Sequence, residues 1–361
     1  MKHQETLMWE EISETPRIFG EIQAINAEEM KRLVNAVGAS SATNFVVAAR
    51  GTSDHALLYF KYITEIYTKY TVSAASPSVL TVYNGKVDYK NSIVIGCSQS
   101  GKAADVLEVI KRGNEQGAIT VGITNDENSP VAKEAKFHLF CAAGEEKSVA
   151  ATKTFSAQLF LMFWLSSEIA ENEKNLGFAA SLKDKIEALI PEIDSLTDTY
   201  SEKFKDMKSG FILSRGITYA IALEATLKLQ ETCYIQMKGF ASSDFYHGPM
   251  AMVNEDTPVI IYCANDRDAD ENVQTLIRND HIKCIDKMIS LGAPVLIVTN
   301  DEKLAGRYPE TNCALLDFPV PEEICMFAFA LFAQMFACKV SCAIGNNPDS
   351  PRALKKVTIT K

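Results

Sequence analysis

Two short loops of the 361-residue chain carry polar side chains of the kind that bind phosphate. Ser98, Gln99 and Ser100 follow one apolar run, and Ser53 follows another. A hydroxyl-rich loop that opens a helix combines side-chain donors with unpaired backbone N–H groups, which is a good phosphate cradle. One hydroxyl suffices to cap a helix, so the cluster of three favours a ligand loop. For Ser53 alone, capping and ligand binding both stay open.

Three charged residues lie at helical spacing further along the chain. Glu224, Lys228 and Glu231 are separated by four and three residues, so a helix places them on one face. Such spacing commonly makes a solvated ion-pair ladder, but a carboxylate beside a lysine at a ligand edge could act as a general base. His247 stands in a His-Gly-Pro turn, where an exposed imidazole could move protons near neutral pH.

The elements that must position these residues occur twice. An apolar run ends in Arg50-Gly51, and a second one ends in Arg215-Gly216; a helix-like segment follows each. Repeated layout of this kind indicates a duplicated domain. Two further pairs of runs match in the same order: 92–97 with 258–263, and 117–126 with 292–301.

Each half alternates β-branched runs with helix-length segments, as in 93–96, 103–116 and 118–124. Apolar strands with helices between them predict a parallel sheet that is covered on both faces. We therefore expect an α/β fold of two doubly wound, flavodoxin-like lobes. Open parallel sheets bind ligands at the carboxyl ends of their strands, where the polar loops would lie.

The same patterns predict the boundaries along the chain. Alternating Val357 and Ile359 indicate an extended, packed tail, and Pro16 breaks the lead-in or opens its second half. The expected segments are a helical lead-in at 1–30, a first lobe at 31–170, a charged helical connection at 171–208, a second lobe at 209–345 and a tail at 346–361.

Composition limits the function classes. The net charge of −10 argues against a nucleic-acid partner. No apolar stretch follows a basic flank at the start, and the run 325–340 is too short to span a bilayer, so we expect no membrane association. Nine scattered cysteines without a CxxC pair predict reduced thiols and a cytoplasmic protein. The histidines show no metal-ligand spacing and GxGxxG is absent, so we expect neither a metal nor a nucleotide cofactor.

Taken together, these motifs resemble the sugar isomerase (SIS) domain family, above all the isomerase half of the glucosamine-6-phosphate synthases. The likeness covers nearly the whole chain. It rests on the double repeat, Ser98-Gln-Ser-Gly101, Ala222-Leu-Glu224 with Lys228 and Glu231, His247-Gly-Pro249, and the tail Pro351-Arg…Lys356-Val-Thr.

The resemblance implies a sugar phosphate as substrate and a homodimer with shared active sites. It implies that Ser98, Gln99 and Ser100 bind the phosphate, and that Ser53 and Val149 contact the sugar.

The resemblance also implies the catalytic roles. Glu231 would move a proton between C1 and C2, with Glu224 and Lys228 supporting it. His247, donated by the partner subunit in this family, would assist ring opening. Lys356 would form a Schiff base with the ketose, since a buried amine can attack a carbonyl.

Some positions depart from the synthase pattern. The chain has no room for a glutaminase domain, so we expect no ammonia supply from glutamine in cis. Lys102 and Ala103 replace Glu and Thr after the serine loop, and Ala151 replaces a serine. The synthases have one residue between the tail lysine and Val-Thr, and this chain lacks it. An alignment on Val-Thr would therefore assign the role of the lysine to Lys355 instead of Lys356. The tail looks more like that of stand-alone deaminases and deglycases of the family.

The leading hypothesis is therefore an enzyme that deaminates glucosamine 6-phosphate or deglycates a fructosamine 6-phosphate. Both reactions need a phosphate anchor, ring opening and C1/C2 proton transfer. An aldose–ketose phosphosugar isomerase would need Glu231 and His247 but no covalent lysine. A non-catalytic sugar-phosphate regulator is the third class, and the combination of Glu, His and Lys favours an enzyme over it.

Overall fold

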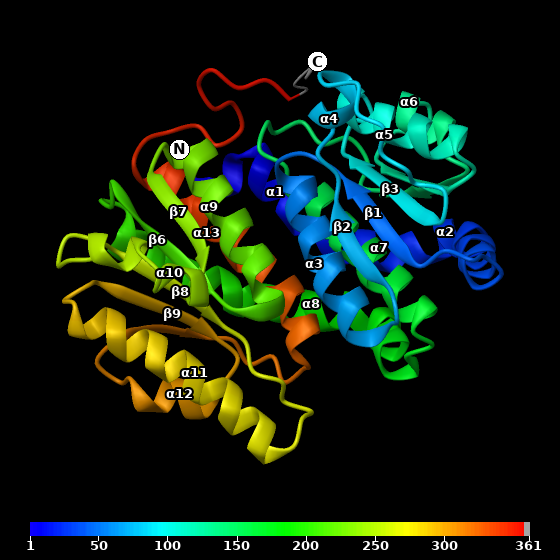
Figure 1. Cartoon of the computed structure of the whole chain (residues 1–361). Helices are drawn as coiled ribbons and strands as arrows, with labels where there is room; N and C mark the ends of the chain where they lie inside the picture. The colour runs from blue at the N-terminus through cyan, green and yellow to red at the C-terminus, as the bar shows by residue number, and fades with distance from the viewer. Residues whose placement is uncertain (357–361) are drawn as a thin grey trace. The chain divides into compact units, whose positions relative to one another are not determined.

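The computed structural model describes residues 1–356, which fall into two α/β units (Figure 1). The N-terminal unit comprises residues 14–147 and 151–184 with tail residues 355 and 356. The C-terminal unit comprises residues 1–13, 148–150 and 185–354. Each unit thus includes a short segment from elsewhere in the chain.

The N-terminal unit is built on a five-stranded sheet in which all strand pairs are parallel, in the order β2-β1-β3-β4-β5. This is the flavodoxin order, so the topological switch point lies between β1 and β3. Its elements are α2 (Thr15–Gly38), β1 (Asn44–Ala48), α3 (Thr52–Tyr67), β2 (Thr71–Ala74), α4 (Ser78–Thr81), β3 (Ser92–Ser98), α5 (Ala104–Glu115), β4 (Ile119–Thr124), α6 (Pro130–Glu134), β5 (Phe137–Phe140) and α7 (Lys153–Ile169).

The C-terminal unit repeats that topology. Its parallel sheet has the order β7-β6-β8-β9-β10, so β6 corresponds to β1 and β8 corresponds to β3. The predicted fold of two doubly wound lobes is confirmed. The elements are η1 (His3–Glu5), α1 (Leu7–Ser13), β6 (Ser209–Ser214), η2 (Gly216–Thr218), α9 (Tyr219–Cys233), β7 (Gln236–Ala241), α10 (Ser242–Phe245), η3 (Pro249–Met252), β8 (Val259–Cys263), α11 (Glu271–Ser290), β9 (Val295–Thr299), α12 (Glu302–Arg307), β10 (Asn312–Leu315) and α13 (Glu322–Ala343).

Between the two sheets in sequence runs α8 (Glu173–Phe204), whose residues before 185 belong to the N-terminal unit and whose later residues belong to the C-terminal unit. In the lead-in, Pro16 stands in the first turn of α2 and opens that helix rather than breaking it. Val357 and Ile359, for which we predict an extended tail, lie outside the described residues.

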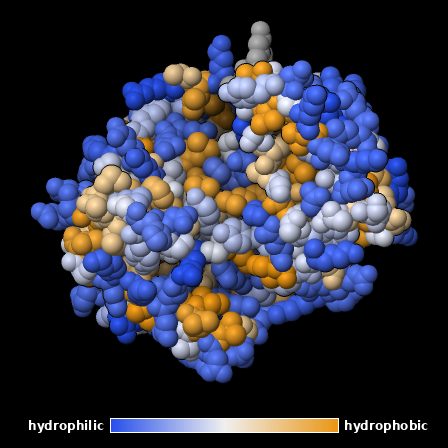
Figure 2. Space-filling model, viewed as in Figure 1, coloured by the Kyte–Doolittle hydropathy of each residue, from blue (hydrophilic) through white to orange (hydrophobic). Residues whose placement is uncertain are grey.

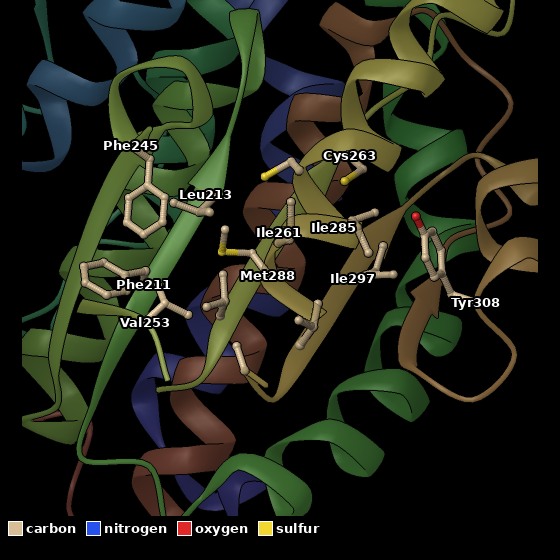
Figure 3. Packing of buried hydrophobic residues seen from close by; sticks show 14 of the residues in the cluster. Phe211, Leu213, Phe245, Val253, Ile261, Cys263, Ile285, Met288, Ile297 and Tyr308 are labelled. Carbon is tan, nitrogen blue, oxygen red and sulfur yellow. The ribbon is translucent and has the colours of Figure 1, made fainter. Parts of the chain in front are cut away.

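Strand sequences explain the cores. Because both faces of a parallel sheet are covered, the central strands are apolar throughout: β8 reads Val-Ile-Ile-Tyr-Cys and is buried at every position. In the C-terminal unit, Leu213 and Ile261 pack with Ile285 and Met288 of α11 (Figure 3). In the N-terminal unit, α5 places Val106, Val109 and Ile110 in a core with residues of β1 and β3.

Helix α13 is apolar along its length, and its burial shows that it belongs to the core of the protein. Among residues 1–356, α13 is the one helix that is long and apolar enough to cross a membrane, and its apolar window is entirely buried inside the protein. The prediction that the run 325–340 is too short to span a bilayer is therefore wrong, because the helix that contains it extends over 22 residues. The expectation that this run forms part of a buried helix is confirmed.

The turn after β3 requires glycine at position 101. Gly101 has φ of +61°, and a Cβ there would lie 2.0 Å from Ser129 Oγ, the hydroxyl that caps α6. Gly117 also has positive φ (+81°), but a Cβ there meets nothing within 4 Å. Both glycines therefore adopt a backbone conformation that other residues rarely adopt, but only at position 101 would a side chain also clash with a neighbouring residue.

We predict that Gly117→Ala costs about 1 kcal/mol of unfolding free energy, because it only strains the backbone. Gly101→Ala should cost roughly 1–3 kcal/mol more, because it also displaces the Ser129 cap. Urea denaturation of both variants measures this difference. Equal losses would contradict the close approach of Gly101 to Ser129.

Candidate functional site

The predicted phosphate loop lies at the carboxyl end of β3. Ser98 is the last residue of that strand, and its Oγ accepts a hydrogen bond from Gly101 N at 3.2 Å. Ser100 Oγ accepts one from Lys102 N at 3.3 Å. The loop does not open the helix directly, since α5 begins at Ala104 and has no side-chain cap. The polar side chains are thus not needed as helix caps, which favours a ligand loop.

Ser53 lies at the same edge of the sheet. The N-cap of α3 is Gly51, with φ of +54°, so Ser53 stands inside the helix and does not cap it. Its hydroxyl lies near the Cys97 thiol: burial raises the pKa of this thiol above the ordinary value, and the neighbouring Ser53 hydroxyl partly lowers it. Ser53 is therefore placed beside the serine loop.

An ion pair that sequence reasoning missed bridges the two loops of this edge. Arg50 Nε donates to Asp105 Oδ2 at 2.6 Å, and the Asp105 side chain is buried. Arg50 follows β1 and Asp105 stands in the first turn of α5, so the pair fixes the spacing across the switch point. The 55 residues that separate the partners hide this contact in the sequence.

The second set of predicted residues forms a buried cluster on α9. Lys228 Nζ lies 3.3 Å from Glu224 Oε1 and 2.6 Å from Glu231 Oε2. The side chains of Lys228 and Glu224 are fully buried, whereas Glu231 keeps 23% exposure. The solvated ion-pair ladder that this spacing usually makes is therefore wrong here, and the cluster presents one partly accessible carboxylate.

Opposite charges surround the buried ammonium of Lys228. Burial by itself lowers the pKa of that ammonium, but the carboxylates of Glu224 and Glu231 raise it above the ordinary value. The ammonium holds the Glu231 carboxylate in place through the contact at 2.6 Å. The arrangement can orient a carboxylate that accepts a proton from a bound molecule.

The tail lysine is also held by a buried carboxylate. Lys356 Nζ donates to Glu146 Oε2 at 2.6 Å, and the Glu146 side chain has no exposure. Glu146 also accepts bonds from the backbone N–H groups of Thr152 and Thr154 and from the Thr154 hydroxyl. Lys355 is exposed, which favours Lys356 as the functional lysine. No local pattern indicates Glu146, because 210 residues separate it from Lys356.

Two further predicted residues lie in the C-terminal unit. His247 is exposed in the turn after α10, and its backbone N–H donates to Asp244 O at 3.1 Å. Val149 belongs to the short segment 148–150, where its N–H donates to Asp349 O at 3.0 Å. These backbone contacts hold the chain at both positions and assign no role to either side chain.

One group of side chains in residues 1–356 has the geometry of a metal site. His3, Asp194 and Asp198 place their ligand atoms within 4.8 Å of one another. Lys339 already pairs with both aspartates, at 2.7 Å from Asp198 Oδ1, and burial followed by Lys339 lowers the pKa of His3. A cation would therefore have to displace an ammonium group. All nine cysteines are free thiols.

We predict that Lys228→Met lowers the unfolding free energy by about 3–5 kcal/mol, because it leaves the Glu224 carboxylate buried without a cation. The double variant Lys228→Met/Glu224→Gln should recover much of this loss, since no buried charge remains. Guanidinium denaturation measures both. An unchanged stability of the single variant would show that the cluster is hydrated rather than buried.

We further predict that Glu146→Gln lowers the melting temperature, because the amide cannot accept all the bonds from Thr152, Thr154 and Lys356. The expected cost is roughly 2–4 kcal/mol. Glu145→Gln is the matched control, since Glu145 is 78% exposed and lies 3.6 Å from Lys147. Equal melting temperatures for the two variants would contradict the anchoring role of Glu146.

Comparisons with known proteins agree with the duplicated fold. The sequence profile of the SIS domain matches residues 40–165 and 203–343. The glutamine--fructose-6-phosphate aminotransferase [isomerizing] of Aquifex aeolicus is 32% identical over 322 residues, which cover 87% of this chain and 51% of that protein. This chain therefore spans about half the length of that relative.

Solved structures show the same architecture. The C-terminal domain of glucosamine-fructose-6-phosphate aminotransferase from Francisella tularensis superposes with a TM-score of 0.83 at 25% identity, covering 96% of this chain and 98% of that one. Glucosamine-6-phosphate deaminase from Thermotoga maritima shares the fold, with a TM-score of 0.75 at 21% identity and coverage of 98% and 100%. Two parallel sheets of identical strand order, each matched by the same profile, mean that the chain belongs to the SIS domain family.

Proposed function

We propose that this chain is an enzyme that removes the nitrogen substituent from an amino sugar phosphate, either by deaminating glucosamine 6-phosphate or by deglycating a fructosamine 6-phosphate. The observation that carries the proposal is the α9 cluster, in which buried Lys228 holds the partly accessible carboxylate of Glu231 at 2.6 Å. A non-catalytic binding module has no need of such an arrangement.

The edge of the first sheet supports a phosphate-binding role. Ser98, Gln99 and Ser100 stand at the carboxyl end of β3, the place where open parallel sheets bind ligands. Ser53 lies beside them through Cys97. In the proposed function these side chains hold the phosphate and the adjacent sugar hydroxyls. Arg50 and Asp105 position the loops without touching the substrate.

Proton transfer falls to the carboxylate in this proposal. Glu231 takes the proton from one of the two carbons C1 and C2 of the open-chain sugar and returns it to the other. Lys228 and Glu224 orient it. His247, exposed in its turn, assists ring opening in the proposed homodimer with shared active sites.

Lys356 is the proposed covalent partner. The neutral amine is the nucleophile, so the ammonium proton of Lys356 leaves before attack; Glu146, 2.6 Å away, positions the amine. The proton shift between C1 and C2 turns the carbon that bears the substrate nitrogen into an imine. The free amine adds to this imine, the substrate nitrogen takes the proton of the lysine nitrogen, its C–N bond breaks, and the ammonia or amine leaves while the Schiff base to Lys356 takes its place. Water then hydrolyses the Schiff base to the sugar carbonyl and frees Lys356. A simple aldose–ketose isomerase would not need this lysine.

The experiment supplies the purified protein with glucosamine 6-phosphate and, separately, with fructosamine 6-phosphates of several amino acids. Ammonia together with fructose 6-phosphate in the first reaction identifies a deaminase. Release of the amino acid in the second identifies a deglycase. Conversion of a phosphosugar without release of nitrogen would favour the isomerase, and thermal stabilisation by sugar phosphates without turnover would favour the regulator.

We predict that Glu231→Gln lowers kcat on the identified substrate by roughly 10²–10⁴-fold, because the amide cannot accept the proton. The melting temperature should change little, since the amide can still accept a bond from Lys228. Glu202→Gln, an exposed carboxylate in α8, is the control and should keep full activity. Near-normal turnover of Glu231→Gln would remove Glu231 as the base.

A further inference from the structure

The C-terminal unit contains a cavity of about 350 Å³ that the proposed function does not use. Its lining includes Arg215, Gly216, Leu276, Asp280, His281 and Glu322. Arg215 and Gly216 follow β6, so the cavity lies where β6 ends in the second sheet.

This place corresponds to the phosphate-loop edge of the first sheet. Because β6 matches β1, Arg215-Gly216 is the counterpart of Arg50-Gly51. The bridging ion pair is also repeated: Arg215 Nη1 donates to Asp280 Oδ1 at 2.7 Å, as Arg50 does to Asp105. The ligand edge of the duplicated fold is thus kept in the second unit.

The chemistry of the edge has changed between the copies. In the first sheet, β3 is followed by Gln99 and Ser100, whereas β8 is followed by Ala264, Asn265 and Asp266. Hydroxyls are missing and an acidic residue is present, so a phosphate group would not be favoured here. The carboxyl-end edge of the second sheet is therefore expected to bind a ligand whose charge differs from that of a phosphate.

Glu322 identifies one end of that ligand. Its Oε1 lies near Gly216, at 3.5 Å from where a Cβ on that glycine would stand. Burial, followed by the charges of Glu323 and Asp266, raises the pKa of Glu322 to about 8. Within residues 1–356 no hydrogen bond or ion pair is made by its carboxyl group. An ammonium group in the cavity would restore the charged form of Glu322 and pair with it.

Arg215 identifies the other end. Its guanidinium has five N–H donors, of which one binds Asp280, and the side chain is 53% exposed. The remaining donors suit a carboxylate, which guanidinium binds in a fork geometry. Gly216, which lies near the Glu322 carboxyl group, directly follows Arg215 in the chain. A site for a cation at Glu322 and a site for an anion at Arg215 together fit a zwitterionic ligand.

The rest of the wall is aliphatic. Leu276 is 72% exposed and Ile277 follows it on α11. Figure 2 shows hydrophobic groups on the surface over the lower part of α11. Burial lowers the pKa of His281, and its Nε2 is bonded to Ala264 O at 2.9 Å, so this ring adds no second cation.

We propose that this cavity binds a free α-amino acid with an aliphatic side chain, its ammonium group on Glu322, its carboxylate on Arg215 and its side chain against Leu276 and Ile277. The proposal is independent of the reaction assigned to the chain. It gives the second copy of the fold a ligand of its own.

The test is isothermal titration calorimetry of the full chain with L-leucine. L-leucine should bind, while isoamylamine, which lacks the carboxylate, and 4-methylpentanoate, which lacks the ammonium group, should bind roughly tenfold to a hundredfold more weakly. Inorganic phosphate and D-glucosamine are comparison ligands. Absence of leucine binding, or tighter binding of either comparison ligand, would overturn the proposal.

Substitutions locate the site. Glu322→Gln should weaken leucine binding roughly tenfold or more, and Glu310→Gln, an exposed carboxylate, should not change it. Titrations at pH 7 in two buffers of different ionisation enthalpy should show a proton released on binding to the native chain and none for Glu322→Gln, because the ammonium ionises Glu322. Leucine binding that is the same in both variants and releases no proton would place the ligand elsewhere.

Discussion

The buried ammonium of Lys228 is the constraint on which the candidate chemistry depends. The fully buried Lys228 and the fully buried Glu224 carboxylate compensate each other's charge, and the partly exposed Glu231 adds a second contact to the lysine. Helical spacing on α9 brings the three together with no help from distant parts of the chain. The result is a carboxylate whose direction is set by the contact with Lys228 before any substrate arrives, which is what a proton-transfer group requires.

The duplication of the fold explains why the carboxyl-end edges of the two sheets carry different side chains in one chain. Both sheets have the same strand order, and at both switch points the arginine after the first strand pairs with an aspartate of the helix that follows the neighbouring strand. The scaffold is therefore maintained while the loops change. Ser98 ends β3 and Gln99 and Ser100 follow it at the first edge. The second edge instead has the Glu322 carboxyl group, whose pKa is raised, and an aliphatic wall. Divergence of loops on a constant sheet is the usual way in which folds of this class acquire new ligands.

Local patterns in the sequence predicted much of this structure. Continuous apolar strands and the repeated Arg-Gly turns were enough to predict two parallel sheets, and spacing alone placed Glu224, Lys228 and Glu231 on one face. What the sequence could not indicate was burial: the same spacing describes a solvated ladder, and only packing of α9 decides between them. Contacts over long separations were also hidden, as for Arg50 with Asp105 and Lys356 with Glu146. The start of α5 at Ala104, beyond the serine loop, depends on local geometry that residue types do not reveal.

The most direct test of the central claim, that the chain moves a proton between C1 and C2 of a phosphosugar, is hydrogen exchange with solvent. The native protein and Glu231→Gln would each be incubated in D₂O with fructose 6-phosphate and with glucosamine 6-phosphate, and deuterium at C1 and C2 followed by NMR. Our account predicts deuterium in the sugar with the native chain and none with the variant. Binding of both sugars by the native chain, with neither exchange nor conversion, would contradict it.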